Sequence, residues 1–101
     1  MSYNSNTIHL RDEMTQKNVT VTTSATELFT GGSRNAKRQV VNLYNDGAQD
    51  CFIGPTGVTA SGATKGTLLE KKNWMTWEIG DVGIFAITDS SSTNIIVTEL
   101  A

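Results

Sequence analysis

Short segments that alternate apolar and hydroxyl residues, separated at close spacing by turn-forming residues, limit this chain to an all-β fold. Residues 18–23 place Val19 and Val21 on one face and threonines on the other, as expected of a half-buried strand. Asp46-Gly47 is the strongest turn signal, because this dipeptide tolerates the positive φ angles of tight hairpins. Six to eight such segments predict a small antiparallel β-sandwich or a jelly-roll-like barrel.

The composition supports this interpretation. Only 38% of the 101 residues are hydrophobic and 18% are charged, and Thr, Ser, Asn and Gly replace the usual helix formers. A net charge of -2 is too small to hold the chain open, and the aromatic and β-branched side chains supply apolar surface for a core. The length has room for one domain. We expect a polar N-terminal arm, residues 1–17, followed by a single β domain, residues 18–101.

The same signals predict the other strands and the core. The clearest strand covers residues 38–44, and others are expected over residues 50–54, 67–70, 74–79, 84–88 and 94–100. Residues expected in or near the core are Val19, Val21, Val41, Leu43, Phe52, Trp77, Ile79, Phe85, Ile87, Ile95 and Val97. Register decides whether Cys51, Trp74, Ile84 and Ile96 join them, because a slip of one residue exchanges the two faces.

A helical turn is also predicted between the first two long strands. Ser24 and Glu27 have the spacing of a capping box, which indicates one short helical turn over residues 24–29. Leu28 and Phe29 would then fill one end of the core.

The sequence has few candidates for a catalytic acid, base or nucleophile. His9 is the single histidine and lies in the polar lead, and Cys51 lies mid-strand beside apolar residues, which favours an inert buried thiol. No Cys or His pair has metal-ligand spacing, although a calcium site among the scattered loop carboxylates stays open. Gly57 and Gly62 have P-loop spacing, but Ala63 stands where the lysine is required. We expect no enzyme, no catalytic residue and no cofactor.

The charge distribution excludes further classes. No basic run is longer than Lys71-Lys72, so no nucleic-acid footprint is present, and the segment with Arg34, Lys37 and Arg38 is interpreted as a solvated approach to a strand. No apolar stretch approaches about 18 residues, so we expect no membrane span. The N-terminus lacks the pattern of a signal peptide, and a single cysteine fits assembly in a reducing cytoplasm.

Eight sequence elements then occur in a particular order. They are Thr20 to Thr23, Ala25-Thr26-Glu27-Leu28-Phe29, Arg38 to Asn42, Phe52-Ile53-Gly54, Gly57-Val58-Thr59-Ala60-Ser61-Gly62, Thr67-Leu68-Leu69, Ile84-Phe85-Ala86-Ile87 and Val97-Thr98-Glu99-Leu100. In this order they resemble a small structural domain of tailed-bacteriophage virion proteins. Residues 1–17 lie outside the resemblance, and Lys71-Lys72-Asn73 departs from its pattern.

The resemblance implies a virion structural protein, with a capsid decoration (cement) protein on the head surface favoured by the single-domain length. Its partner is then the major capsid protein or another virion protein, and assembly occurs in the host cytoplasm. The alternatives are a head fibre component, a tail or baseplate accessory, and a host-glycan-binding module, the last with Trp74, Tyr44 and residues 57–66 as its site.

Partner-binding residues are predicted in two places. The arm carries the spaced apolar anchors Tyr3, Ile8, Leu10 and Met14, which we expect to fill shallow pockets on the capsid or on the next subunit. Tyr44 and Trp74 are the aromatic candidates in the β domain. Strand edges without guarding charges or prolines predict a homo-oligomer, with a trimer favoured.

Overall fold

The structure is a computed structural model that describes residues 13–101. Tyr3, Ile8 and Leu10 of the predicted arm therefore lie outside the described residues. The described residues form eight strands and one short 3-10 turn, η1 (Gly62–Thr64). The strands are β1 (Met14–Val21), β2 (Thr26–Glu27), β3 (Val40–Asn45), β4 (Cys51–Gly54), β5 (Thr67–Leu69), β6 (Trp74–Trp77), β7 (Phe85–Ile87) and β8 (Thr93–Leu100).

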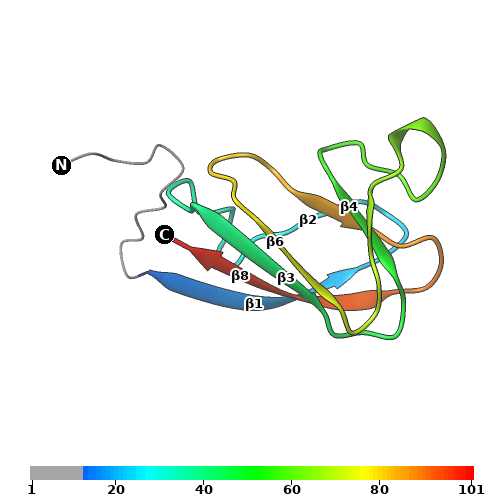
Figure 1. The fold of residues 1–101 in the computed structure, drawn as a ribbon, viewed down its shortest axis with the longest axis horizontal. Coiled ribbons are helices and arrows are strands. Elements are labelled where there is room, and N and C mark those ends of the chain that lie inside the picture. The colour runs from blue at the N-terminus through cyan, green and yellow to red at the C-terminus, as the bar shows by residue number, and fades with distance from the viewer. Residues whose placement is uncertain (1–12) are drawn as a thin grey trace.

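The strands form two four-stranded antiparallel sheets, which confirms the predicted fold class (Figure 1). The first sheet has the order β1-β8-β3-β6 and the second has the order β2-β7-β4-β5. The start of β1 and the C-terminus lie at one end of the sandwich. The segment between β4 and β5 lies at the other end.

The strand pairing identifies the sandwich as a jelly roll. β4 pairs with β5, β3 with β6, β2 with β7 and β1 with β8, so the chain is one long ribbon folded back after Gly54. The ribbon is rolled up because β8 also pairs with β3, and β7 with β4. Of the two predicted forms, the eight-stranded jelly roll is the one observed.

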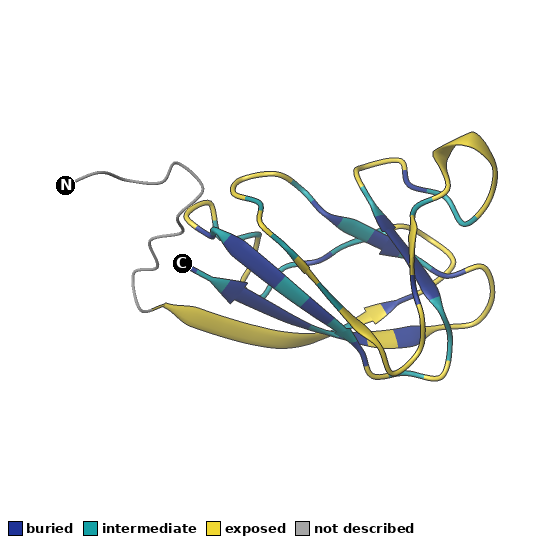
Figure 2. Cartoon of the chain, viewed as in Figure 1, coloured by how far each residue is buried: buried dark blue, intermediate teal, exposed yellow. Residues whose placement is uncertain are grey.

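The core lies between the two sheets, and most of it follows the predicted alternation. Figure 2 shows β3 and β8 buried over most of their length, whereas β1 is exposed over most of its own. Val21, Val41, Leu43, Ile95 and Val97 are fully buried, which confirms their predicted position. Val19, Trp77 and Ile79, also predicted, pack against this cluster together with Met75.

The prediction for β7 is wrong by one residue. Ile84 and Ala86 belong to the buried cluster, whereas Phe85 and Ile87 are only partly buried. The apolar run over residues 84–87 has no alternation to fix its face, so the pairing with β4 decides it. Phe52 is buried but lies outside the cluster, because its neighbour Ile53 takes the inward position.

Two predictions near the start of the domain are also corrected. The first strand begins at Met14 rather than at residue 18, so the last four residues of the predicted arm belong to β1 and pair with β8. Residues 24–29 form no helical turn, because β2 pairs with β7 and Arg34 takes the Glu27 carboxylate at 2.8 Å. Leu28 is nevertheless fully buried, as predicted.

Candidate interaction surface on the outer face of the first sheet

The outer face of the sheet β1-β8-β3-β6 is uncharged. Because the odd-numbered residues of β3 and β8 point into the core, the even-numbered residues of all four strands point outward. Along the rows of paired residues, this face carries Met14, Leu100 and Val40; Gln16, Thr98, Asn42 and Thr76; Asn18, Ile96, Tyr44 and Trp74; and Thr20 and Asn94. Lys, Arg, Asp and Glu are missing from these positions.

The polar residues of this face bind one another. Gln16 Nε2 donates to Thr98 Oγ1 at 3.1 Å, and Thr76 Oγ1 donates to Asn42 Oδ1 at 2.9 Å. Because these pairs already satisfy part of their hydrogen-bonding capacity, covering them with a partner surface costs less desolvation free energy than covering free polar groups.

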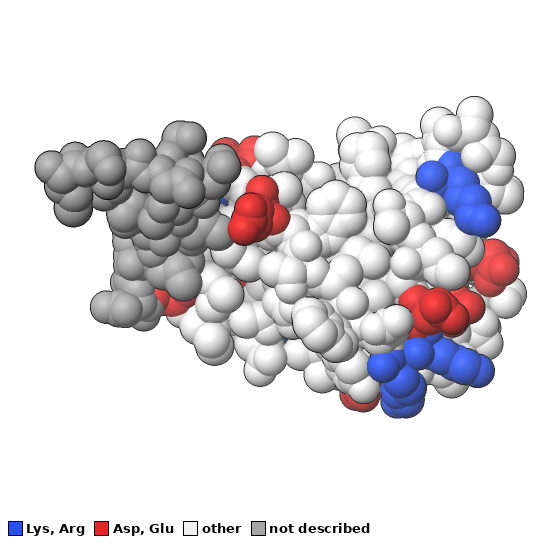
Figure 3. Space-filling view, in the orientation of Figure 1, with Lys and Arg blue, Asp and Glu red and all other residues white. Residues whose placement is uncertain are grey.

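Two apolar residues of this face, Trp74 and Met14, are largely exposed. Trp74 is 65% exposed at the end of one row, and its paired neighbour across the strands is the half-buried Tyr44. Met14 is 68% exposed in the row with Leu100 and Val40. In Figure 3 the surface over the middle of the visible face is largely uncharged, and the Lys and Arg side chains gather toward one end.

The structure thus places three of the predicted partner-binding residues on one face of the sheet. Tyr44 and Trp74 are neighbours, and Met14 lies on the same face as part of β1 rather than in an arm. Residues 57–66 belong to the connection between β4 and β5 in the other sheet, so they do not join Tyr44 and Trp74 in the predicted glycan site. Alternation within β3 and β6 indicates which residues share a face, whereas the pairing of Tyr44 with Trp74 is known only from the structure.

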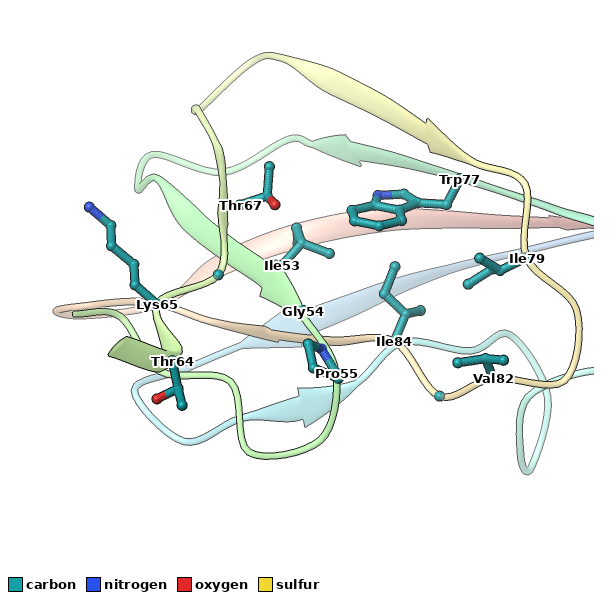
Figure 4. Close-up of a pocket in the computed structure, with 12 residues that line it drawn as sticks. Ile53, Gly54, Pro55, Thr64, Lys65, Thr67, Trp77, Ile79, Val82 and Ile84 are labelled. Carbon is teal, nitrogen blue, oxygen red and sulfur yellow. The ribbon is translucent and has the colours of Figure 1, made fainter. Parts of the chain in front are cut away.

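A second feature is a cavity of about 300 Å³ between the edge strands β5 and β6 (Figure 4). Its apolar lining comes from both sheets and from the β6–β7 connection. The principal lining residues are Ile53, Pro55, Trp77, Ile79, Val82 and Ile84. Sequence analysis missed this cavity, because two separate sheets and a loop have to meet to enclose it.

A third feature is a buried ion pair that the sequence did not predict. Arg38 Nη1 lies 2.7 Å from Glu99 Oε2, and both side chains are 0% exposed, so the interpretation of Arg38 as solvated is wrong. Glu99 Oε1 also accepts from the backbone N–H of Thr30 at 3.0 Å and from its hydroxyl at 2.6 Å. Glu99 Oε2 accepts from the Asn35 N–H at 3.0 Å.

Arg38 extends this network to the β6–β7 connection. Its Nε donates to the Gly80 carbonyl at 3.0 Å, and its Nη2 donates to the Val82 carbonyl. The neighbouring Arg34 binds Asp81 at 2.8 Å. Two arginines therefore hold the loop that forms one rim of the cavity.

Cys51 is buried in the core and is expected to be chemically unreactive in the folded protein. Burial, assisted by the negative charge of Asp50, raises the pKa of the Cys51 thiol to about 12. Alkylation requires the thiolate, so iodoacetamide at pH 8 should modify the native protein at least ~100-fold more slowly than the urea-unfolded protein. Mass spectrometry of timed reactions measures both rates, and equal rates would contradict the buried position.

Within residues 13–101, no group of three or more His, Cys, Asp or Glu residues is placed to hold a metal ion. No helix in the described part of the chain is long and apolar enough to cross a membrane. No protein-family model matches the sequence, and no curated protein or solved structure matches the chain.

Proposed function

We propose that the chain is a structural protein of a tailed-bacteriophage virion, a capsid decoration protein that binds the assembled head through the outer face of the β1-β8-β3-β6 sheet. The observation that carries the proposal is the uncharged character of this face, with Trp74 exposed beside Tyr44. Large aromatic residues dominate the binding free energy of protein interfaces, and charged residues are depleted from interface centres.

The sheet makes this face a rigid docking surface. Its side chains stand on four paired strands, and the central strands β8 and β3 are each paired on both sides. A surface that is ordered before binding loses less conformational entropy when the partner arrives. A protein that binds only the assembled shell stabilises that shell by mass action, which is the physical role of a cement protein.

The fold supports the proposal by analogy. Jelly rolls form the domains of many viral capsid proteins, and also of lectins. Because a fold hosts many functions, the fold is an argument by analogy, and the outer face of the first sheet carries the proposal. The sequence elements that resemble phage virion domains point in the same direction.

The exposed edge of β1 supports a homo-oligomer in the assembled state. β1 is an eight-residue edge strand, exposed over most of its length, and Lys17 is its single charged residue. Long edges of this kind pair readily with another chain. A closed ring on a symmetric particle, with a trimer favoured, would cover such edges.

Replacing Trp74 by serine is expected to weaken binding to undecorated phage heads at least ~30-fold, because a tryptophan that dominates an interface commonly contributes about 2 kcal/mol or more. The side chain is mostly exposed, so the variant should fold normally. The matched control is Leu68→Ser, which removes an exposed apolar side chain (47% exposed) from the other sheet. Co-sedimentation with heads, and separately with tails, measures the binding.

The outcomes separate the alternatives. Head binding that Trp74→Ser weakens and Leu68→Ser does not supports decoration through this face. Sedimentation with tails alone would overturn the head assignment and favour a tail or baseplate accessory. Binding that a host glycan competes away, and that depends on Trp74, would favour the glycan-binding module.

A further inference from the structure

We infer that the cavity between β5 and β6 binds a small, uncharged, apolar molecule. Ile53 and Ile84 are buried, and Trp77 lies across from both of them (Figure 4). Pro55, Ile79 and Val82 complete the apolar wall. This inference does not depend on the docking proposal, because the cavity opens between the sheets rather than on the outer face.

The charge of the lining excludes a charged ligand. Lys65 is the one charged residue among those that line the cavity, and its Nζ lies 5.1 Å from the centroid of the Phe52 ring. In Figure 4 the Lys65 ammonium points away from Trp77. An ion placed in this cavity would lose its hydration without gaining a counter-ion, which is strongly unfavourable.

Trp77 adds apolar surface, rather than a hydrogen-bond donor, to the wall of the cavity. The indole N–H of Trp77 is buried and has no hydrogen-bond partner among residues 13–101. Because this nitrogen is shielded from solvent-sized atoms, a molecule in the cavity meets the carbon atoms of the indole ring rather than its N–H.

The rim of the cavity is fixed before a ligand arrives. Arg38 binds the carbonyls of Gly80 and Val82, while Arg34 binds Asp81, so side-chain contacts hold the loop at three successive points. Val82, although apolar, is 59% exposed on this rim. A preformed apolar pocket with an apolar rim is the usual form of a small-molecule site.

The volume sets the size of the ligand. About 300 Å³ is the lower end of the range for small-molecule sites. At the packing density of a protein interior, this space holds about ten non-hydrogen atoms. 2-Decanone has this size, is mainly apolar and carries no charge, so it is a suitable probe.

The test is a titration of the full chain with 2-decanone. In the Trp74→Phe background, Trp77 is the single tryptophan, and its fluorescence reports on the cavity alone. We expect saturable 1:1 binding with a dissociation constant on the order of 10⁻⁴ M, confirmed by calorimetry. Decanoate and decyltrimethylammonium, which match the chain length but carry a charge, should bind at least ~10-fold more weakly.

Two variants on the same strand locate the binding. Thr67 pairs with Ile53 and lines the cavity, so Thr67→Phe should fill its mouth and weaken 2-decanone binding at least ~10-fold. Leu68 points to the opposite face of β5, so Leu68→Phe should leave binding unchanged. The absence of saturable binding to the parent protein, or equal affinity in a folded Thr67→Phe variant, would overturn the inference.

Discussion

Replacing Glu99 by glutamine is expected to lower the free energy of unfolding by about 3 to 5 kcal/mol, the cost of leaving a buried charge without its partner. Glutamine keeps the shape of the side chain, so the loss reports on charge rather than on a cavity. Arg38 would remain fully buried, and glutamine cannot accept all the hydrogen bonds that the carboxylate accepts from Thr30, Asn35 and Arg38. Urea unfolding followed by circular dichroism measures the change.

Two controls show that the burial of the charge is responsible. Replacing both Arg38 and Glu99 by methionine removes both charges and should recover much of the loss, because buried ion pairs are often replaceable by apolar residues. Asp81→Asn breaks an ion pair whose carboxylate is 58% exposed and should change the stability far less. A double variant as unstable as Glu99→Gln would contradict this account.

The same carboxyl group links stability to pH. Burial raises the pKa of Glu99, but hydrogen bonds from Thr30, Arg38 and Asn35 outweigh it and leave the pKa below its ordinary value of 4.5. A lowered folded-state pKa stabilises the protein above the unfolded-state pKa, and this stabilisation is lost as the pH falls through the folded-state value. The stability difference between the parent and Glu99→Gln should therefore be constant above about pH 5.5 and shrink in more acidic solution.

The second large effect is expected at Gly47, where alanine should cost about 3 kcal/mol of unfolding free energy. A Cβ at this position would lie 1.9 Å from Thr93 Oγ1 and 2.8 Å from the Asn94 nitrogen, so the start of β8 has to move. Thr93 Oγ1 donates to the fully buried Asn45 Oδ1 at 2.7 Å. Asn45 Nδ2 in turn donates to the Leu69 carbonyl at 3.1 Å.

A displacement of the start of β8 by the Gly47→Ala substitution would therefore disturb the hydrogen bonds of Asn45, which join the β3–β4 turn to β5 and β8. Gly32→Ala is the matched control, because nothing lies within 4 Å of a Cβ at that position. The free energy of unfolding of this variant should be nearly that of the parent protein. Thermal and urea unfolding of both variants measure the difference. Equal stability of the two variants would show that β8 can shift at little cost.

The sequence by itself determined the fold class and most of the faces of the long strands. In β3, Val41 and Leu43 alternate with the polar or half-exposed Asn42 and Tyr44, so a period of two residues fixes both the strand and its inward face. The same local rule put Trp74 on the face opposite Trp77, although register left open whether Trp74 joins the core. These features depend on neighbours in the chain, which is why a single sequence reveals them.

The tertiary structure decided which face of β7 is buried and whether residues 24–29 form a helical turn, because the local sequence pattern does not settle either. The apolar run over residues 84–87 fits either register, and the pairing of Ala86 with Ile53 selects one. Ser24 and Glu27 have helix-capping spacing, yet pairing with β7 and the ion pair with Arg34 make this segment a strand. Pairing between distant segments outweighs a weak local preference.

The buried charges and the cavity belong entirely to the tertiary structure. Arg38 and Glu99 lie 61 residues apart in the chain, and from the sequence alone both resemble ordinary surface charges. The jelly-roll topology places Arg38 Nη1 2.7 Å from Glu99 Oε2. The cavity likewise needs Ile53 from one sheet, Trp77 from the other and Val82 from a loop. Sequence periodicity describes which face a residue takes, whereas the rolling of the ribbon decides which faces meet.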